Sequence, residues 1–277
     1  MALPINIEDL LNIQTIENAT NTSEHMRTRY RMYIKPHEIF SAGWNFRDWE
    51  VLFYDVLHAF SRDKSDDGVI SVSNNDREFC FVSDRQIYLN DNIALVQAVS
   101  ESFSVIQNRG KTEVRFKPDK SIWPEMIINE SALENIIKDY AYLHSNQTII
   151  WKGQNYHYPE GLKDMLKKEF GITSDIIWIR KWDIEIAIAR TDNGEQTVID
   201  YVNTNRTNGE VHVNTLKKAI KTYLPEVAKK GYVAVFDINV LKNEILYESG
   251  YYNRVVQIPK DRENYIISAI KQYLGKV

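Results

Sequence analysis

The sequence predicts an α+β protein made of two consecutive domains, residues 1–172 and 173–277. Apolar residues recur at helical spacing in several stretches, which predicts helices with one buried face. Between them lie short runs of alternating apolar and polar residues separated by Asn, Asp and Gly, which predicts strands joined by tight turns. Near Gly171 to Ser174 the same mixture of patterns starts again, and this restart predicts the domain boundary.

The first domain is expected to begin with a polar arm, residues 1–35, in which Asn, Thr and Glu dominate. From Trp44 to Phe60 the apolar side chains fall on one face of a predicted helix. Residues 65–84 then read as a strand, a turn of two Asn and one Asp, and a second strand, because Asn tolerates positive φ. The further elements expected in this domain are a helix at 92–103, a hairpin turning at Asn108 to Gly110, a helix from Glu130, a strand at 147–153 and a helix within 156–170. We therefore expect helices on one face of a mixed sheet.

The second domain is expected to open with a long hairpin over residues 175–203 that turns at Asp192, Asn193 and Gly194, since Asn-Gly between apolar alternations is a strong hairpin signal. An amphipathic helix at 213–230, a strand at 232–240 and a closing helix at 263–274 complete it. Each domain thus has enough apolar residues in periodic positions for a core of its own.

Composition limits the classes of protein and of site that remain. Hydrophobic residues make up 43% and aromatic residues 12% of the 277 residues, which excludes a disordered chain. The net charge of −4 favours neither nucleic acid nor an anionic membrane overall. The single cysteine, Cys80, permits no internal disulfide and no cysteine-rich zinc site. No run of about 20 apolar residues predicts a membrane span, and the N-terminus lacks the pattern of a signal peptide, so we expect a cytoplasmic protein without membrane contacts.

Four segments, which occur in the family's order along the chain, resemble the ATPase region of gyrase B and other type II topoisomerases. "GKTEVRFKPD" at 110–119 resembles the family's G-T-x-V-x-F-x-P-D, and "RTRYRMYI" at 27–34 resembles its R-x-R-P-x-M-Y-I. "YAYLHSNQTIIWKGQNYHYPEGLKDML" is similar to its A-F-L-N-x-G-x-x-I strand and Y-x-G-G-I-x-x-[FY] helix start. "IEIAIARTDNGEQTVIDYVNTNRTNGEVHVNTLKKAIKTYL" resembles its V-E-V-A-x-Q-W hairpin, followed by F-x-N-N-I-x-T-x-x-G-G-T-H and a helix. The resemblance runs from about Met26 to Val277.

This resemblance implies a Bergerat-type (GHKL) ATPase domain, a sandwich of helices on a mixed sheet, up to residue 172. It implies a transducer domain of ribosomal-S5-like fold from residue 173. The metal-binding TOPRIM domain and the active tyrosine of the family have no counterpart in this sequence. We therefore expect that this chain alone does not cut DNA.

The resemblance also implies a nucleotide site, with His58, Asp84 and Thr112 as its candidate residues. His58 stands where the family has the metal-binding Asn of E-x-x-x-N-A, and Tyr54 stands where it has the general-base Glu. Tyrosine is not a base near neutral pH, and the adjacent Asp55 is rotated by about 100° on the helix. A histidine packed on a buried helix face is the alternative reading of His58.

Asp84 occupies the position of the acidic residue of D-D-G-R-G, which holds the adenine amino group in the family, although strand alternation places Ser83 there equally well. Thr112 corresponds to a threonine near the adenine pocket. Each residue also has a reading without a ligand: Asp84 as a solvated aspartate at a strand end, and Thr112 as an ordinary strand residue.

Two further parts of the family's ATPase machinery are missing from the sequence. Between Gln86 and Ile93 there is only a short link, where the family has a lid with G-x-x-G-x-G whose amides bind triphosphate. Glu248, Ser249 and Gly250 stand where the family has Q-T-K, whose lysine reaches the γ-phosphate. We accordingly predict no catalytic residue, no metal ligand and no cofactor.

Three functions remain as hypotheses. The favoured one is a degenerate, non-hydrolysing gyrase-B-like module that acts through contacts with a protein, either as a homodimer or with a topoisomerase-like subunit, or through contacts with DNA. The alternative is a divergent ATP-binding subunit of a type II topoisomerase with a separate cleavage subunit, which would bind ATP and Mg²⁺. The third is a module for another ligand or for nucleic acid, for which the lysines of 217–230 are either the contact surface or a solvated helix face.

Overall fold

The structure is a computed structural model. It describes residues 49–61, 66–87, 93, 96–97, 99–108, 110–181, 183–207, 210–240, 246–248, 251–257 and 259–274. The predicted N-terminal arm, the start of the predicted helix at Trp44, residues 88–92 of the link before Ile93, and Ser249 with Gly250 lie outside these residues.

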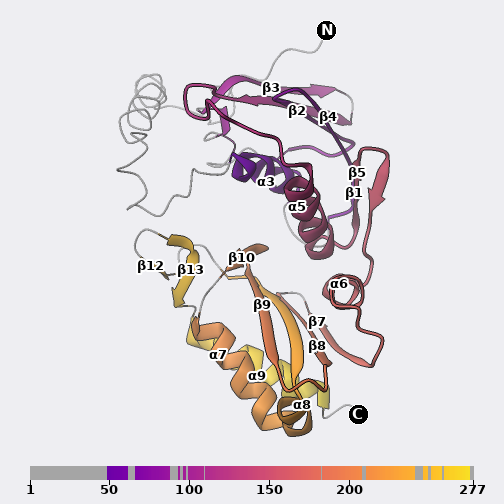
Figure 1. Ribbon diagram of the computed structural model, residues 1–277, viewed down its shortest axis with the longest axis vertical. Coiled ribbons are helices and arrows are strands. Elements are labelled where there is room, and N and C mark those ends of the chain that lie inside the picture. The colour runs from indigo at the N-terminus through magenta and orange to yellow at the C-terminus, as the bar shows by residue number, and fades with distance from the viewer. Residues whose placement is uncertain are drawn as a thin grey trace. The chain divides into compact units, whose positions relative to one another are not determined.

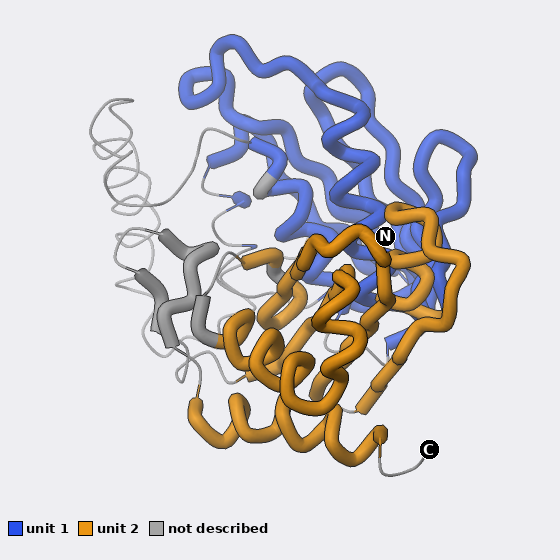
Figure 2. Tube along the Cα trace, turned by 60° about the horizontal axis from the view of Figure 1, so that its bottom comes forward, with its two compact units in different colours: residues 1–40, 45–159 blue, residues 41–44, 160–277 orange. Residues whose placement is uncertain are grey.

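The chain divides into two compact units at residues 159 and 160 (Figure 2). The first unit ends thirteen residues before the expected position at 172, because helix α6 (Leu162–Glu169) packs on strands of the second unit. Each unit has its own cluster of buried apolar side chains. Among the described residues, no helix combines the length and the apolar character that crossing a bilayer requires.

Unit 1 is a six-stranded mixed sheet with helices on one face (Figure 1). Its strands follow the order β3-β4-β2-β1-β5-β6, and only β1 and β5 pair in parallel. In chain order the elements are α3 (Glu50–Ala59), β1 (Gly68–Asn75), β2 (Glu78–Ser83), β3 (Ser100–Asn108), β4 (Lys111–Pro118), α5 (Glu130–Leu143), β5 (Gln147–Trp151) and β6 (Gln154–Tyr156).

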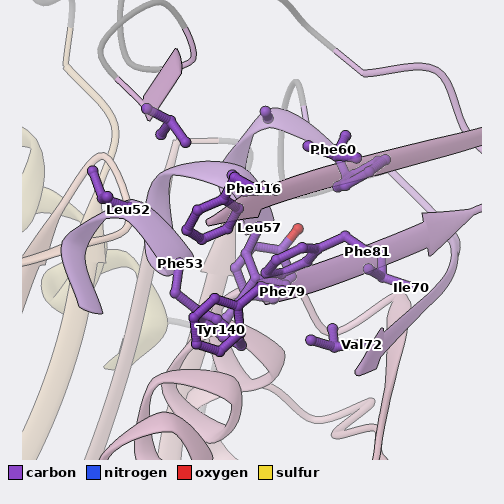
Figure 3. Close-up of a cluster of buried hydrophobic side chains, with 14 of the residues drawn as sticks. Leu52, Phe53, Leu57, Phe60, Ile70, Val72, Phe79, Phe81, Phe116 and Tyr140 are labelled. Atoms are coloured by element: carbon purple, nitrogen blue, oxygen red, sulfur yellow. The ribbon is translucent and has the colours of Figure 1, made fainter. Parts of the chain in front are cut away.

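The core of unit 1 lies between the sheet and helices α3 and α5. Phe53 of α3 packs edge-on against Phe79 of β2, with ring centroids 5.5 Å apart, and Phe79 stacks on Phe116 of β4 at 5.3 Å. Figure 3 shows these rings together with Tyr140 of α5. Val114 and Phe116 alternate with more exposed residues along β4, and both side chains lie in this core.

Unit 2 is a five-stranded sheet in the order β10-β9-β11-β8-β7, with helices α7 and α9 on one face and a separate two-stranded hairpin (Figure 1). After α6, the elements are β7 (Ile176–Lys181), β8 (Ile184–Arg190), β9 (Gln196–Val202), β10 (Asn205–Thr207), α7 (Glu210–Tyr223), α8 (Pro225–Lys230), β11 (Tyr232–Ile238), β12 (Leu246–Glu248), β13 (Tyr251–Gln257) and α9 (Lys260–Leu274).

The predicted hairpin at Asp192, Asn193 and Gly194 is wrong. The chain does reverse there, but β11 lies between β8 and β9, antiparallel to the first and parallel to the second. The amide of Gly194 donates to the carbonyl of Lys230 at 2.9 Å, so the turn pairs with the start of β11. A Cβ atom on Gly231 would lie 2.7 Å from the Glu195 carbonyl oxygen, and this approach requires glycine. The hairpin in this part of the chain joins β7 to β8.

Two predicted helices also have different limits. Ser100 to Phe103, expected at the end of a helix, belong to β3, because Phe103 and its neighbours pair with β4. The predicted helix at 213–230 is two helices, α7 and α8. Pro225 begins α8, since proline has no N–H for a continuing helix and fits the first helical position.

Candidate functional site

The candidate site of unit 1 lies at one end of its sheet. There β2 ends at Ser83, while β4, β1 and β5 begin: Ser83 is opposite Thr112, and Gly68 is opposite Gln147. The C-terminal ends of α3 and α5 supply the remaining side chains of the site. Residues distant in sequence therefore meet at this end of the sheet.

His58, a predicted site residue on the last turn of α3, packs among aromatic rings. Its ring centroid lies 4.0 Å from that of Tyr54, 5.1 Å from Tyr140 and 5.3 Å from His144. Part of the residue reaches the surface, but its Nε2 atom is buried. Burial lowers the pKa of His58 to about 3, because the charged form would lose its hydration. The imidazole is therefore neutral near pH 7.

Beside His58, four polar side chains form a hydrogen-bonded network that joins α3, α5 and β5. The hydroxyl of Tyr140 donates to Oε1 of Gln147 at 2.8 Å. Nε2 of Gln147 donates to the hydroxyl oxygen of Ser61. The Ser61 oxygen also lies 3.2 Å from Nδ1 of His144 and 3.2 Å from the Tyr140 hydroxyl. We call Ser61, Tyr140, His144 and Gln147 the unit 1 network.

Two of these hydrogen bonds have directions that follow from the donors available: the Gln147 amide nitrogen donates to Ser61, and the Tyr140 hydroxyl donates to Gln147. Which of Ser61 and Nδ1 of His144 donates to the other is set by the His144 tautomer. Burial raises the pKa of Tyr140 well above its ordinary value, so its hydroxyl remains a donor. Ser61, Tyr140 and Gln147 thus take part in the network as uncharged groups.

Thr112 and Ser83 are a cross-strand pair, 1% and 2% exposed, whereas Asp84 is exposed. One carboxylate oxygen of Asp84 accepts from the amide of Val69 at 3.2 Å. The Ser83 hydroxyl oxygen accepts from the amide of Arg85 at 3.1 Å. Of the two residues that strand alternation left open for the adenine position, Ser83 is thus the one that faces inward.

The structure brings together Thr112 and Asp84 at neighbouring strand ends, and it places His58 between α3 and α5. Sequence reasoning missed the unit 1 network. One signal was available: Tyr140 and His144 are four residues apart on α5, so they lie on one helix face. Ser61 and Gln147 gave no signal in the sequence, since 86 residues separate them.

Within the described part of the chain, no group of three or more His, Cys, Asp or Glu side chains could hold a metal ion.

Unit 2 buries a different kind of polar cluster between its sheet and α7. Nε2 of His212 lies 2.7 Å from Oδ2 of Asp200, and the Thr207 hydroxyl donates to the same carboxylate oxygen. All three side chains are buried, and the His212 ring meets Phe236 edge-on at 5.7 Å. A carboxylate on β9 thereby ties β10 to α7.

A second carboxylate of unit 2, Glu185 on β8, holds the start of α6. Its Oε1 accepts from the amide of Leu162 at 2.9 Å and from the indole N–H of Trp178 at 3.1 Å. Gly161 precedes the helix with φ of 54°, and a Cβ atom there would lie 2.5 Å from the same oxygen. Glu185 therefore binds the free amide at the helix start, where the helix dipole favours a negative charge.

Comparison of the sequence with protein-family models and with curated proteins gives no match. Comparison of the structure with solved structures does give matches. The chain is similar to the B-subunit of the DNA gyrase from Myxococcus xanthus, with 15% identity, 90% of this chain and 93% of that chain covered, and a TM-score of 0.66. It is similar to the 43K ATPase domain of Thermus thermophilus gyrase B, with 14% identity, 94% and 90% covered, and a TM-score of 0.67.

The chain has the fold of the gyrase B ATPase region. It is also similar to the ATPase region of Saccharomyces cerevisiae topoisomerase II, with 13% identity, 86% of this chain and 84% of that chain covered, and a TM-score of 0.53. These likenesses extend over both units, which confirms the GHKL and transducer fold expected from the sequence motifs. In this gyrase-B-like fold, the unit 1 network and His58 occupy the ends of α3 and α5.

Proposed function

We propose that the chain is a non-hydrolysing, gyrase-B-like module that acts by binding a protein partner. The observation that carries the proposal is the unit 1 network, in which Ser61, Tyr140, His144 and Gln147 bind one another beside His58. The polar groups of these side chains are hydrogen-bonded to one another at the C-terminal end of α3. The family resemblance places the metal-binding and general-base residues on this helix. The fold is retained, and the groups needed for hydrolysis are replaced.

The replaced groups are those on which ATP hydrolysis depends. Phosphoryl transfer to water needs a metal to neutralise the phosphates, a residue to orient the water and a cation to stabilise developing charge. His58 in place of Asn is neutral, with its pKa lowered to about 3, and it packs against Tyr54 in place of Glu. Neither Tyr54 nor His58 supplies a carboxylate at the positions where the family has its general-base Glu and its metal-binding Asn.

For the partner, we favour a second copy of this chain or a topoisomerase-like subunit of the same fold. Similar folds carry similar surfaces, so a chain with this fold can form a mixed or symmetric dimer. Contact with DNA is the competing possibility, supported by the exposed Lys218 and Lys221 of α7 and Lys229 and Lys230 of α8. Sedimentation of the purified chain, alone and with each gyrase subunit of its native cell, tests the protein partner directly.

The hydrolysis part of the proposal is tested with the purified full chain, ATP and magnesium, with and without DNA. We expect phosphate release no faster than from buffer, and no heat of binding with a non-hydrolysable ATP analogue up to millimolar concentration. His58→Ala serves as the variant and Asp76→Ala, in the exposed turn between β1 and β2, as the matched control. Turnover that survives purification and disappears in His58→Ala alone contradicts the proposal.

The alternative function is a divergent ATP-binding subunit, and one observation favours it. Thr112 and Asp84 lie at adjacent strand ends, where the resemblance places the adenine contacts. Micromolar binding of the ATP analogue that Asp84→Ala abolishes would favour this function. In that case the carboxylate can accept from the adenine amino group and keep its hydrogen bond from the Val69 amide, because only one of its two oxygens accepts from Val69.

A further inference from the structure

A strained turn in unit 2 joins β9 to β10. Its two central residues, Asn203 and Thr204, have φ of 51° and 64°, both in the left-handed region. Val202 is paired with Asn205 across the turn, as in a two-residue hairpin of type I′. Asn is common in such turns, but a β-branched residue at positive φ is strained. Surrounding contacts must therefore hold Thr204 in place.

Several of those contacts come from the end of β11 and the residues after it. The Thr204 amide donates to Oδ1 of Asp237, which is fully buried, at 3.1 Å. The Asn203 amide donates to the carbonyl of Ile238 at 2.9 Å. The side chain of Asn203 makes a reciprocal pair with the backbone of Val240: its Oδ1 accepts from the amide at 2.7 Å, and its Nδ2 donates to the carbonyl at 2.8 Å. The turn is thus bonded to the place where the chain leaves the sheet.

The elements that follow the turn are fixed as well. Thr207 of β10 and His212 of α7 both bind the Asp200 carboxylate, so β10 and the first turn of α7 are tied to β9. The hairpin β12–β13 contacts this same region, because β13 packs against β10 and α7. The hairpin belongs to neither of the two larger sheets. The surface of β10 on which β13 packs therefore depends on the Asn203–Thr204 turn.

We propose that the Asn203–Thr204 turn is a conformational latch that sets the position of the β12–β13 hairpin. With the latch closed, the hydrogen bonds to Asp237, Ile238 and Val240 hold the strained backbone. When those bonds break, the strain at Thr204 favours an open turn, and the hairpin loses the fixed surface of β10 against which β13 packs. The hairpin is the part of unit 2 whose conformation the latch can change without disrupting the sheet.

The test is amide hydrogen exchange of the full chain, read in Leu246–Glu248 and Tyr251–Gln257. Asn203→Ala removes the reciprocal pair with Val240, and we expect exchange in the hairpin to accelerate about tenfold. Asn193→Ala is the matched control: Asn193 also accepts a backbone hydrogen bond, from Glu195 at 2.9 Å, in the turn at the other end of β9. The control is expected to exchange like the wild type in the hairpin.

A second variant keeps the test decisive if Asn203→Ala does not fold. Thr204→Gly retains the amide that binds Asp237 and relieves the strain, so we expect hairpin exchange about threefold slower than in the wild type. The proposal is overturned if Asn203→Ala accelerates exchange only at residues 203, 204 and 240, if the control accelerates the hairpin equally, or if Thr204→Gly leaves the hairpin unchanged or faster.

Discussion

The two units bury histidine side chains in opposite surroundings. In unit 1, His58 and His144 lie among aromatic rings, a serine hydroxyl and a glutamine amide. In unit 2, His212 is hydrogen-bonded to the carboxylate of Asp200. Both arrangements lie between a sheet and the helices on one of its faces, so burial alone does not decide what a histidine does there.

The difference between neutral partners in unit 1 and a carboxylate partner in unit 2 determines how each cluster responds to change. Neutral groups such as those of unit 1 need little compensation beyond hydrogen bonds, but they offer no charge to a metal ion or to a phosphate. Burying the Asp200 carboxylate of unit 2 costs free energy, and hydrogen bonds from the donors around it have to offset that cost. We therefore expect the clusters to differ in their response to substitution and to pH.

The largest effect is expected from removing the carboxylate of unit 2. Asp200→Ala leaves His212 and Thr207 buried without the acceptor that they share, and we expect it to lower the free energy of unfolding by about 3 kcal/mol. The measurement is urea-induced unfolding. Asp192→Ala is the control, because Asp192 is half exposed and its ion pairs lie at the surface. Equal losses in the two variants would show that the buried cluster contributes nothing particular.

A smaller effect is expected from acidification of unit 1. The pKa of His58 is lowered from 6.5 to about 3 by burial, so the unfolded chain takes up a proton in this range and the folded chain does not. Stability contributed by neutral His58 is therefore present above pH 6.5 and is lost as the pH falls toward 3. Between pH 6 and pH 4 we expect a loss of about 2 kcal/mol. The loss should be absent from His58→Phe, and it should therefore appear in the difference between wild type and this variant, measured by urea unfolding at each pH.

The smallest effect tests a single bond of the unit 1 network. Tyr140→Phe removes the hydroxyl that donates to Gln147, and we expect a loss of about 1 kcal/mol in the free energy of unfolding. Tyr156→Phe makes the same chemical change where the hydroxyl binds the exposed Gln154, so it should cost less. A neutral result for both variants would mean that the network is not needed for stability, and the contrast with unit 2 would be sharper.

Local signals predicted the elements whose limits depend on neighbouring residues. The helix expected from Glu130 begins there, because the Asn129 side chain accepts from the Ala132 amide at 3.1 Å and caps it. The turn between β1 and β2 contains Asp76 at φ of 52°, in the Asn and Asp segment that predicted it. The predicted C-terminal limit of the helix at 92–103 was wrong, because Ser100 to Phe103 pair with β4 and belong to a strand.

The sequence by itself determined the fold, through motifs spread over both units. The resemblance also predicts that Tyr54 and His58 stand where the family has a carboxylate and an amide. Only the tertiary structure decided that β11 separates β8 from β9, since the turn at Asp192 to Gly194 specifies a chain reversal but not which strand pairs next. It also decided that Ser61, Tyr140, His144 and Gln147 form one network. Hydrogen bonds between residues some 80 positions apart depend on how helices pack on a sheet, and no local pattern encodes that packing.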